Sequence, residues 1–300
     1  MAALSATVSK EMRAFIAGAK TAGQKTHKTV AVQRVDLEAF MSALNVPSEV
    51  QLQDFVLANR PARKYTPPNA TANAGVFCLH GGGYRVGSLN AYNSFMSYIA
   101  LACQAPVFGL DYRLAPESRY PAALDDAVAA FVELSEIVPP KKMMILGDSA
   151  GGGLALACLL RLKDQDLQLS GCATLLSPFL DATYSGASYG DRRAEFRQGI
   201  QQYVGDFPLE TVGVSPLFGD HIGLPPILIQ AATDESIVDD SLLFQARAIE
   251  AGVDSRIELF ANAFHVFQVF TDIPEAQQAI AGIGKFFKQH IRHKFIGDHR

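Results

Sequence analysis

The chain has 300 residues, a formal net charge of −4 and an apolar fraction of 49%. A chain of this length and apolarity can bury the core of one large domain, with or without a small appendage, and it lacks the composition of a disordered protein. Its acidic and basic residues are interspersed and leave no basic face, which argues against a protein that binds nucleic acid.

The cysteines and the N-terminus indicate the compartment. Four cysteines lie inside or beside apolar runs, namely Cys78, Cys103, Cys158 and Cys172. Such positions are typical of buried free thiols, and no pair has the spacing of a zinc site. The first apolar stretch carries Lys10, Glu11 and Arg13, which is untypical of a signal peptide, and no segment is long enough to span a bilayer. We therefore expect a soluble, cytoplasmic protein without a membrane span.

Helical patterns over Glu11–Ala19 and Leu37–Leu44 precede the first predicted strand. From about residue 76 onward, short β-rich runs alternate with longer helical patterns. The predicted strands are Val76–Leu79, Pro106–Leu110, Met143–Leu146, Ala173–Leu176, Ile227–Ala231 and Ile257–Phe260. The helices that alternate with them are predicted over Tyr92–Cys103, Ala122–Leu134, Leu154–Leu162, Ser241–Ala251 and Ala276–Ile291. This order predicts an α/β fold with a mainly parallel, twisted sheet and helices on both faces.

Two regions depart from this alternation. Residues 1–50 hold helical patterns before any strand, and residues 182–213 are rich in Gly, Tyr, Arg and Gln just after a strand. Long irregular loops are uncommon in compact domains. We therefore predict that the two regions together form a helical cap. Residues 1–50 would supply its N-terminal part, and residues 51–300 would form the main domain with a cap insertion at about 182–213.

The strongest motif is Gly147-Asp148-Ser149-Ala150-Gly151, between a predicted strand and a predicted helix. It fits the G-x-S-x-G nucleophile elbow, in which a strained turn exposes a serine hydroxyl above the sheet. The glycines allow close backbone approach, and the helix N-terminus adds positive partial charge. An incidental serine in a glycine-rich turn is one alternative, and phosphate binding at the helix start is another. Neither G-x-G-x-x-G nor G-K-[ST] is present to support the phosphate alternative.

A second glycine motif, His80-Gly81-Gly82-Gly83, follows the strand Val76–Leu79. A run of glycines lets bare backbone N–H groups point at a carbonyl oxygen that becomes tetrahedral, as acyl transfer requires. His80 is interpreted as a local hydrogen-bonding residue rather than a catalytic one. A plain turn is the structural alternative for this motif, but its place upstream of the elbow favours catalysis.

The histidine of a triad should follow the serine and a triad acid along the chain. His27 and His80 precede Ser149, and His221 comes before the strand that should carry the acid. His290, His293 and His299 lie in or beyond the polar last helix. His265 remains, just after the last predicted strand, where a general base can reach the serine. A packed histidine in an apolar loop is the alternative.

The acid is expected at the end of the strand Ile227–Ala231, which runs into Thr233-Asp234-Glu235. Asp234 lies nearest the strand's carboxyl end, where α/β sites collect, and is the predicted acid. Asp239 is the second candidate. It and Asp240 also suit helix capping, because they precede the helix predicted over Ser241–Ala251.

Three segments together resemble the hormone-sensitive-lipase-like family of bacterial esterases. They are the HGGG run at 80–83, the run Asp111-Tyr112-Arg113-Leu114-Ala115-Pro116-Glu117 followed by Tyr120-Pro121-Ala122-Ala123, and GDSAG at 147–151. The resemblance extends from about residue 76 to residue 290. It implies an α/β-hydrolase fold with a helical cap built from the N-terminus and a mid-chain insertion. Many relatives carry Asp-Pro-Leu at the acid, whereas Asp234 is followed by Glu235 and Ser236, as in a branch with Asp-Glu.

Carried over by position, the resemblance implies a triad of Ser149, Asp234 and His265. It places an oxyanion hole on the backbone N–H groups of Gly82, Gly83 and Ala150. In the family the DYRLAPE run is a structural element, so Asp111, Arg113 and Glu117 are expected to be scaffold residues. Tyr84 and Arg85 follow the glycine loop and are candidate acyl-pocket residues, with a surface role as the alternative.

The function so implied is a serine carboxylesterase that hydrolyses short- to medium-chain acyl esters through an acyl-enzyme. A lactone hydrolase or a small-molecule deacetylase would use the same triad, and a non-catalytic ligand-binding protein on a hydrolase fold is the alternative of another class. No metal and no organic cofactor is expected. The expected partner is a small-molecule ester, and the strand edge near Ile257–Phe260 and the last helix are candidate surfaces for a homodimer.

Overall fold

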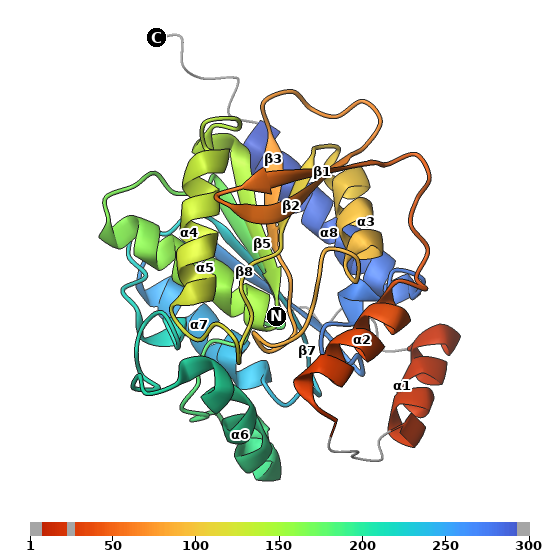
Figure 1. Cartoon of the computed structure of the whole chain (residues 1–300), viewed down its shortest axis with the longest axis vertical. Coiled ribbons are helices and arrows are strands. Elements are labelled where there is room, and N and C mark those ends of the chain that lie inside the picture. Colours follow the sequence, from red (N-terminus) through yellow and green to blue (C-terminus); the bar gives the residue numbers. More distant parts are fainter. Residues whose placement is uncertain (1–7, 23–27, 293–300) are drawn as a thin grey trace.

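The computed structural model describes residues 8–22 and 28–292. Their strands form one eight-stranded sheet in the order β1-β2-β4-β3-β5-β6-β7-β8 (Figure 1). The strands that follow the N-terminal hairpin are β3 (Gly75–Leu79), β4 (Val107–Leu110), β5 (Met143–Asp148), β6 (Cys172–Leu176), β7 (Ile227–Ala232) and β8 (Ser255–Phe260). These six strands pair in parallel, and β3 to β7 are buried along their whole length. Near-continuous apolar runs are what a parallel strand covered on both faces requires. The predicted parallel sheet is confirmed.

Helices cover both faces of the sheet, as predicted. On one face lie α4 (Ala122–Leu134), α5 (Ala150–Asp164) and α7 (Val238–Glu250), which share one large apolar core with the strands. On the other face, α3 (Asn93–Cys103) and α8 (Pro274–Phe287) pack against each other over a second core. The two layers flank the sheet in Figure 1. This three-layer arrangement brings the carboxyl ends of the parallel strands to one edge, where the candidate residues lie.

One pair of strands was not predicted. β1 (Gln51–Leu57) and β2 (Arg60–Thr66) form an antiparallel hairpin, and β2 pairs antiparallel with β4. Its turn residues Ala58 and Asn59 both have positive φ, at 50° and 60°, the geometry that two-residue hairpin turns favour. β1 is largely exposed, so its polar residues do not give the apolar run by which the inner strands were identified.

The helices of the predicted cap regions lie at one end of the sheet. The N-terminal region forms α1 (Lys10–Ala22) and α2 (Val30–Met41), and the mid-chain region forms a short 3-10 segment (Ala187–Arg192) and α6 (Arg193–Val204). α2 and α6 lie at the lower end of the molecule in Figure 1. α1 is held by Ser9, whose backbone N and Oγ both donate to the carboxylate of Glu275 at the start of α8. The assignment of a separate cap domain stays a prediction.

All four cysteines are free and buried, as expected. Within residues 8–22 and 28–292, no helix has the length and apolarity that crossing a membrane would need. β8 forms one edge of the sheet, and its pairing with a second copy stays a prediction.

Candidate active site

Ser149 lies at the sharp turn between β5 and α5, as the elbow motif predicts. Its backbone has φ 51° and ψ −119°, a strained conformation for a residue with a side chain. The turn is tight because a Cβ on Gly147 would lie 2.1 Å from the carbonyl oxygen of Gly151. A Cβ on Gly151 would lie 2.1 Å from the carbonyl oxygen of Leu79 in β3. Both glycines are therefore required by close backbone contacts.

His265 lies in the loop after β8 and contacts Ser149. Its Nε2 is 2.9 Å from Ser149 Oγ, and its Nδ1 is 2.7 Å from Oε2 of Glu235. A carboxylate can only accept a hydrogen bond, so Nδ1 donates to Glu235 and Nε2 is left to accept from the Ser149 hydroxyl. The structure thus joins a candidate nucleophile, a candidate base and an orienting carboxylate in one series of hydrogen bonds.

The carboxylate that contacts His265 is Glu235, which corrects the prediction of Asp234. The Glu235 side chain is completely buried (0% exposed), whereas Asp234 is exposed. The turn between β7 and α7 directs the two neighbouring side chains differently, and only Glu235 reaches the histidine. The second candidate, Asp239, accepts a hydrogen bond from the backbone N of Ser188 instead. Residue order alone gave no signal for choosing Glu235 over its neighbour.

Among the described residues, no other histidine forms a hydrogen bond with Ser149. His80 is buried, and its Nδ1 lies 2.7 Å from the carbonyl oxygen of Gly81, while its ring stacks on Tyr112. Burial lowers the pKa of His80, which favours a neutral ring that donates to this carbonyl. His221 Nε2 lies 3.0 Å from the carbonyl oxygen of Pro216. The structure does not describe His27, His293 and His299.

The glycine loop after β3 lies beside Ser149. Gly82 and Gly83 have φ of +114° and +61°, a region that favours glycine. The carbonyl of Gly82 accepts from the backbone N of Arg85 and of Val86, each at 3.1 Å, which closes the loop into a tight turn. Gly82, Gly83 and Ala150 line the same cavity as Ser149, as an oxyanion hole requires.

Asp148 anchors this loop from the position before the nucleophile. Its Oδ1 accepts from the backbone N of Gly81 at 2.8 Å, and its Oδ2 accepts from the hydroxyl of Tyr92 at 2.9 Å. Burial raises the pKa of Asp148 to about 6, against the lowering effect of both hydrogen bonds. The Gly81 N–H is therefore occupied, which leaves Gly82 and Gly83 as the loop's candidate donors to an oxyanion. Sequence reasoning assigned Asp148 no role.

Ser149 and His265 open into a cavity of about 570 Å³. Its apolar wall comes from both predicted cap regions and from the main domain, through Leu37, Met41, Phe179, Tyr184, Phe196, Ile200, Ile237, Val269 and Phe270. A concave, mostly apolar site of this size with a few polar groups is typical for a small molecule. α2 and α6 thus both line the cavity into which Ser149 opens.

The two predicted pocket residues both line this cavity. Tyr84 is buried and stacks on Tyr203, with ring centroids 3.8 Å apart and an interplanar angle of 4°. Arg85 is partly buried, and its Nη1 donates to Oε1 of Gln202 in α6 at 3.3 Å. Neither side chain is a plain surface residue.

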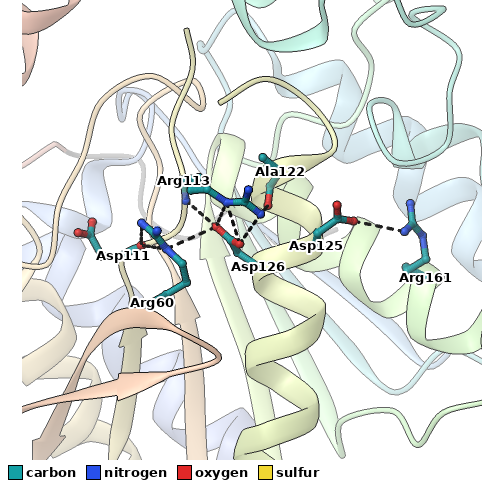
Figure 2. Close-up of polar contacts among 7 residues, drawn as sticks. All are labelled: Arg60, Asp111, Arg113, Ala122, Asp125, Asp126 and Arg161. Carbon is teal, nitrogen blue, oxygen red and sulfur yellow. Dashed lines mark hydrogen bonds and ion pairs between the residues drawn. The ribbon is translucent and has the colours of Figure 1, made fainter. Parts of the chain in front are cut away.

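Residues of the DYRLAPE run bind α4 and β2, as expected of scaffold residues. The Arg113 guanidinium binds the buried carboxylate of Asp126 in α4, and Arg60 from β2 donates to the carbonyl oxygen of Asp111 (Figure 2). Arg60 also approaches Asp126, at 3.6 Å. Figure 2 shows both guanidinium groups directed at the one carboxylate.

α2 is fastened to this scaffold by Arg34. Its guanidinium donates to both carboxylate oxygens of Glu117, at 2.9 and 2.7 Å, and to the carbonyl oxygen of Ala115 at 2.9 Å. Its Nε donates to the carbonyl oxygen of Arg85 at 2.7 Å. One side chain therefore couples the N-terminal helical region to the glycine loop. Sequence reasoning missed Arg34.

Several known proteins are similar to this chain in sequence or in structure. The family model described as alpha/beta hydrolase fold matches residues 76–269. An esterase from Acinetobacter venetianus is 37% identical over 228 residues, covering 72% of this chain and 75% of the relative. An acetyl-hydrolase from Streptomyces hygroscopicus is 33% identical over 276 residues, covering 89% and 90%. A crystal structure of an esterase of the bacterial hormone-sensitive lipase family superposes with a TM-score of 0.91 at 32% identity, covering 95% of this chain and 99% of that chain.

The match to the family model spans more than half of the chain, and the relatives cover most of its length at 30% identity or more. The eight-stranded sheet and the contacts from Ser149 through His265 to Glu235 are consistent with membership of a hydrolase family. The chain therefore belongs to the bacterial hormone-sensitive lipase family of the alpha/beta hydrolase superfamily and is a carboxylic ester hydrolase.

Proposed function

We propose that this enzyme hydrolyses short- to medium-chain acyl esters through a covalent acyl-enzyme on Ser149. The observation that carries the proposal is the unbroken contact from Glu235 through His265 to Ser149, at 2.7 and 2.9 Å, in the wall of an apolar cavity. Nucleophile, base and orienting acid within hydrogen-bond distance are the minimum apparatus of acyl transfer by a serine.

In the first half of the reaction, Ser149 Oγ attacks the ester carbonyl while Nε2 of His265 takes its proton. Glu235 holds the imidazole in the required tautomer and stabilises its charged form. His265 then protonates the alcohol as the C–O bond breaks, which leaves an acyl-Ser149 ester. In the second half, His265 removes a proton from water, and the resulting attack releases the acid and restores the Ser149 hydroxyl.

The tetrahedral oxyanion is proposed to lie on the backbone N–H groups of Gly82, Gly83 and Ala150. The turn at Gly82 and Gly83 fixes its donors before substrate binds, and Ala150 opens helix α5, whose N-terminus carries positive partial charge. Fixed donors of this kind are worth about 10²- to 10³-fold in kcat each.

The size of the acyl group is inferred from the cavity and from relatives. The cavity of about 570 Å³ is lined in part by Tyr84, whose ring stacks on Tyr203. Among the relatives are a protein named ethyl acetate hydrolase and a structure soaked with p-nitrophenyl butyrate. These features support short acyl groups over long ones. The names acetyl-hydrolase and versiconal hemiacetal acetate esterase favour a second candidate, the removal of acetyl groups from a hydroxylated small molecule.

The proposal is tested with p-nitrophenyl esters of increasing chain length and with a Ser149→Ala variant. We expect kcat/KM to be higher for the butyrate than for the palmitate, and we expect Ser149→Ala to lower kcat by about 10⁴-fold or more. The melting temperature of the variant controls for misfolding. Substantial turnover by the folded variant would exclude Ser149 as nucleophile, and a preference for palmitate would exclude the short-chain assignment.

A further inference from the structure

Arg85 places a cation in the wall of the active-site cavity, next to the glycine loop. It follows Tyr84 directly after the HGGG run, and its Nε lies 4.0 Å from the position that a Cβ on Gly83 would occupy. On the other side the guanidinium faces α6, where a Cβ on Gly199 would lie 3.5 Å from Nη2. The guanidinium therefore lies between the glycine loop and α6.

No carboxylate among the described residues balances the charge of Arg85. Among the described residues its guanidinium has one hydrogen-bond acceptor, the neutral amide oxygen of Gln202 at 3.3 Å, and no carboxylate lies within ion-pair distance. Its Nε is buried and has no acceptor in that part of the chain. Burial lowers the pKa of Arg85, as expected of a desolvated cation, although an arginine stays protonated in proteins.

The other charged groups of the cavity have partners. Arg192 lies 3.6 Å from Glu195 and also donates to Ser236, so these two opposite charges offset each other. Asp148 is held by Gly81 and Tyr92. Among the charged groups that line the cavity, Arg85 is thus the cation that lacks a counter-charge from the described residues. Burying an arginine without an anion is unfavourable unless a ligand supplies one.

We propose that Arg85 binds a carboxylate carried by the ester substrate. The planar guanidinium belongs to a cavity-lining residue, keeps donors without a protein acceptor among the described residues, and suits a carboxylate. The substrate class is therefore an ester that bears a carboxylate within reach of the scissile bond. The charge can sit on the acyl side, as in a monoester of a dicarboxylic acid, or on the alcohol side, as in an acylated hydroxy acid. This inference rests on the proposed function and extends it to a class of substrate.

The test compares charged and neutral esters of matched length. Monoethyl glutarate is paired with ethyl pentanoate for the acyl side, and 3-acetoxypropionate is paired with propyl acetate for the alcohol side. The measured quantity is the ratio of kcat/KM for the charged ester to that for the neutral one. In Arg85→Gln we expect this ratio to fall about 10- to 100-fold in one of the two pairs, mainly through KM, because a hydrogen bond to a charged group is lost. The pair that responds identifies the side that carries the charge.

Arg85→Lys should lose less than Arg85→Gln, because the charge remains while the planar fork is lost. Arg256→Gln is the matched control, since it removes an exposed arginine on β8 that pairs with Glu258. An unchanged ratio in both pairs would overturn the role of Arg85, as would the same fall in Arg256→Gln.

Binding to the Ser149→Ala variant separates this inference from the proposed function. Calorimetry with monoethyl glutarate and with 3-acetoxypropionate should show affinity for at least one of them that is about 10-fold or more weaker in Ser149→Ala/Arg85→Gln. This measurement needs no turnover. If the wild-type enzyme hydrolyses none of the four esters but the binding difference holds, the proposed function fails while the carboxylate site stands. Equal binding by the two variants overturns the site.

Discussion

Glu235, and not its neighbour Asp234, contacts His265, the proposed general base, with Oε2 of Glu235 lying 2.7 Å from Nδ1 of His265. The carboxylate is completely buried, and its second oxygen, Oε1, has no hydrogen-bond partner among the described residues. A buried carboxylate with so few other partners interacts chiefly with the one cation that can form beside it, the His265 imidazolium. The contact therefore serves the histidine rather than the surrounding loop.

We expect Glu235→Gln to lower kcat for p-nitrophenyl butyrate by about 10³- to 10⁴-fold, because an amide can fix the wrong tautomer of His265 and cannot stabilise its charged form. Asp234→Asn is the matched control. Its side chain is exposed, and we expect an effect of about twofold or less. A larger loss in Asp234→Asn than in Glu235→Gln would show that the acid acts from a different residue in the working enzyme.

The serine and the histidine could be predicted because the fold constrains them strongly. Ser149 must lie where a strand ends and a helix begins, and the glycines around it report the close backbone contacts that the structure contains. His265 is the histidine that follows both the serine and the acid-bearing strand and precedes the last helix. Element order is enough to select both residues.

The acid could not be selected in this way. Asp234 and Glu235 are adjacent after β7, and which of them faces the site depends on the backbone path of a five-residue turn. Composition does not determine that path. Similarly, the hairpin of β1 and β2 escaped prediction because an exposed edge strand needs no apolar run, and because its turn uses Ala58 at positive φ, where alanine is not favoured. The contacts of Arg34 with the carbonyl oxygens of Arg85 and Ala115 join segments that are distant in the sequence, so no local sequence pattern indicates them.

Asp148 is expected to act as a positioning residue for the oxyanion loop. Asp148→Ala removes the nearer acceptor of the Gly81 N–H, at 2.8 Å, and leaves this donor only the Tyr92 hydroxyl at 3.1 Å. We therefore expect the loop to lose its fixed shape and kcat to fall about 10- to 100-fold with a smaller change in KM. Asp148→Asn keeps an acceptor oxygen of the same size and should restore most of the lost kcat. Steady-state kinetics with p-nitrophenyl butyrate measure both. If the two variants lose equal activity, the charge of Asp148, and not its hydrogen bond, is what the site requires.

The ion pair of Arg113 and Asp126 is expected to stabilise the fold (Figure 2). Asp126 is buried and accepts from the Arg113 side chain and from its backbone N. Removing it in Asp126→Ala leaves these donors unpaired, and we expect the free energy of unfolding to fall by about 2 kcal/mol, since the Arg113 side chain is 43% exposed and water compensates in part. The measurement is urea denaturation followed by circular dichroism.

Asp125→Ala provides the control for this prediction. Asp125 is the preceding residue in α4 and pairs with Arg161 at 3.6 Å with both side chains partly exposed. Exposed pairs contribute little, so we expect a change of about 0.5 kcal/mol or less. Equal losses in the two variants would mean that Asp126 acts through helix α4 itself rather than through Arg113.

Asp240 should make the stability of the enzyme depend on pH. It is buried and accepts from the backbone N of Leu180, the backbone N of Asp181 and the Tyr189 hydroxyl, which fastens the mid-chain insertion to α7. Burial raises the pKa of Asp240 to about 7 from its ordinary 3.8, and the nearby Asp181 adds to this rise against the lowering effect of the hydrogen bonds.

Because the folded state holds this proton more tightly than the unfolded state, the contribution of Asp240 is most favourable below about pH 4 and is lost as the pH rises to about 7. The loss amounts to at most about 4 kcal/mol, at about 1.4 kcal/mol per pH unit. Asp240→Asn cannot ionise, so its stability relative to the wild type should increase by this amount between those pH values. Asp239→Asn, which removes the neighbouring half-buried carboxylate, is the control. Denaturation curves at several pH values decide: wild type and Asp240→Asn with parallel pH profiles would show that Asp240 does not titrate in this range.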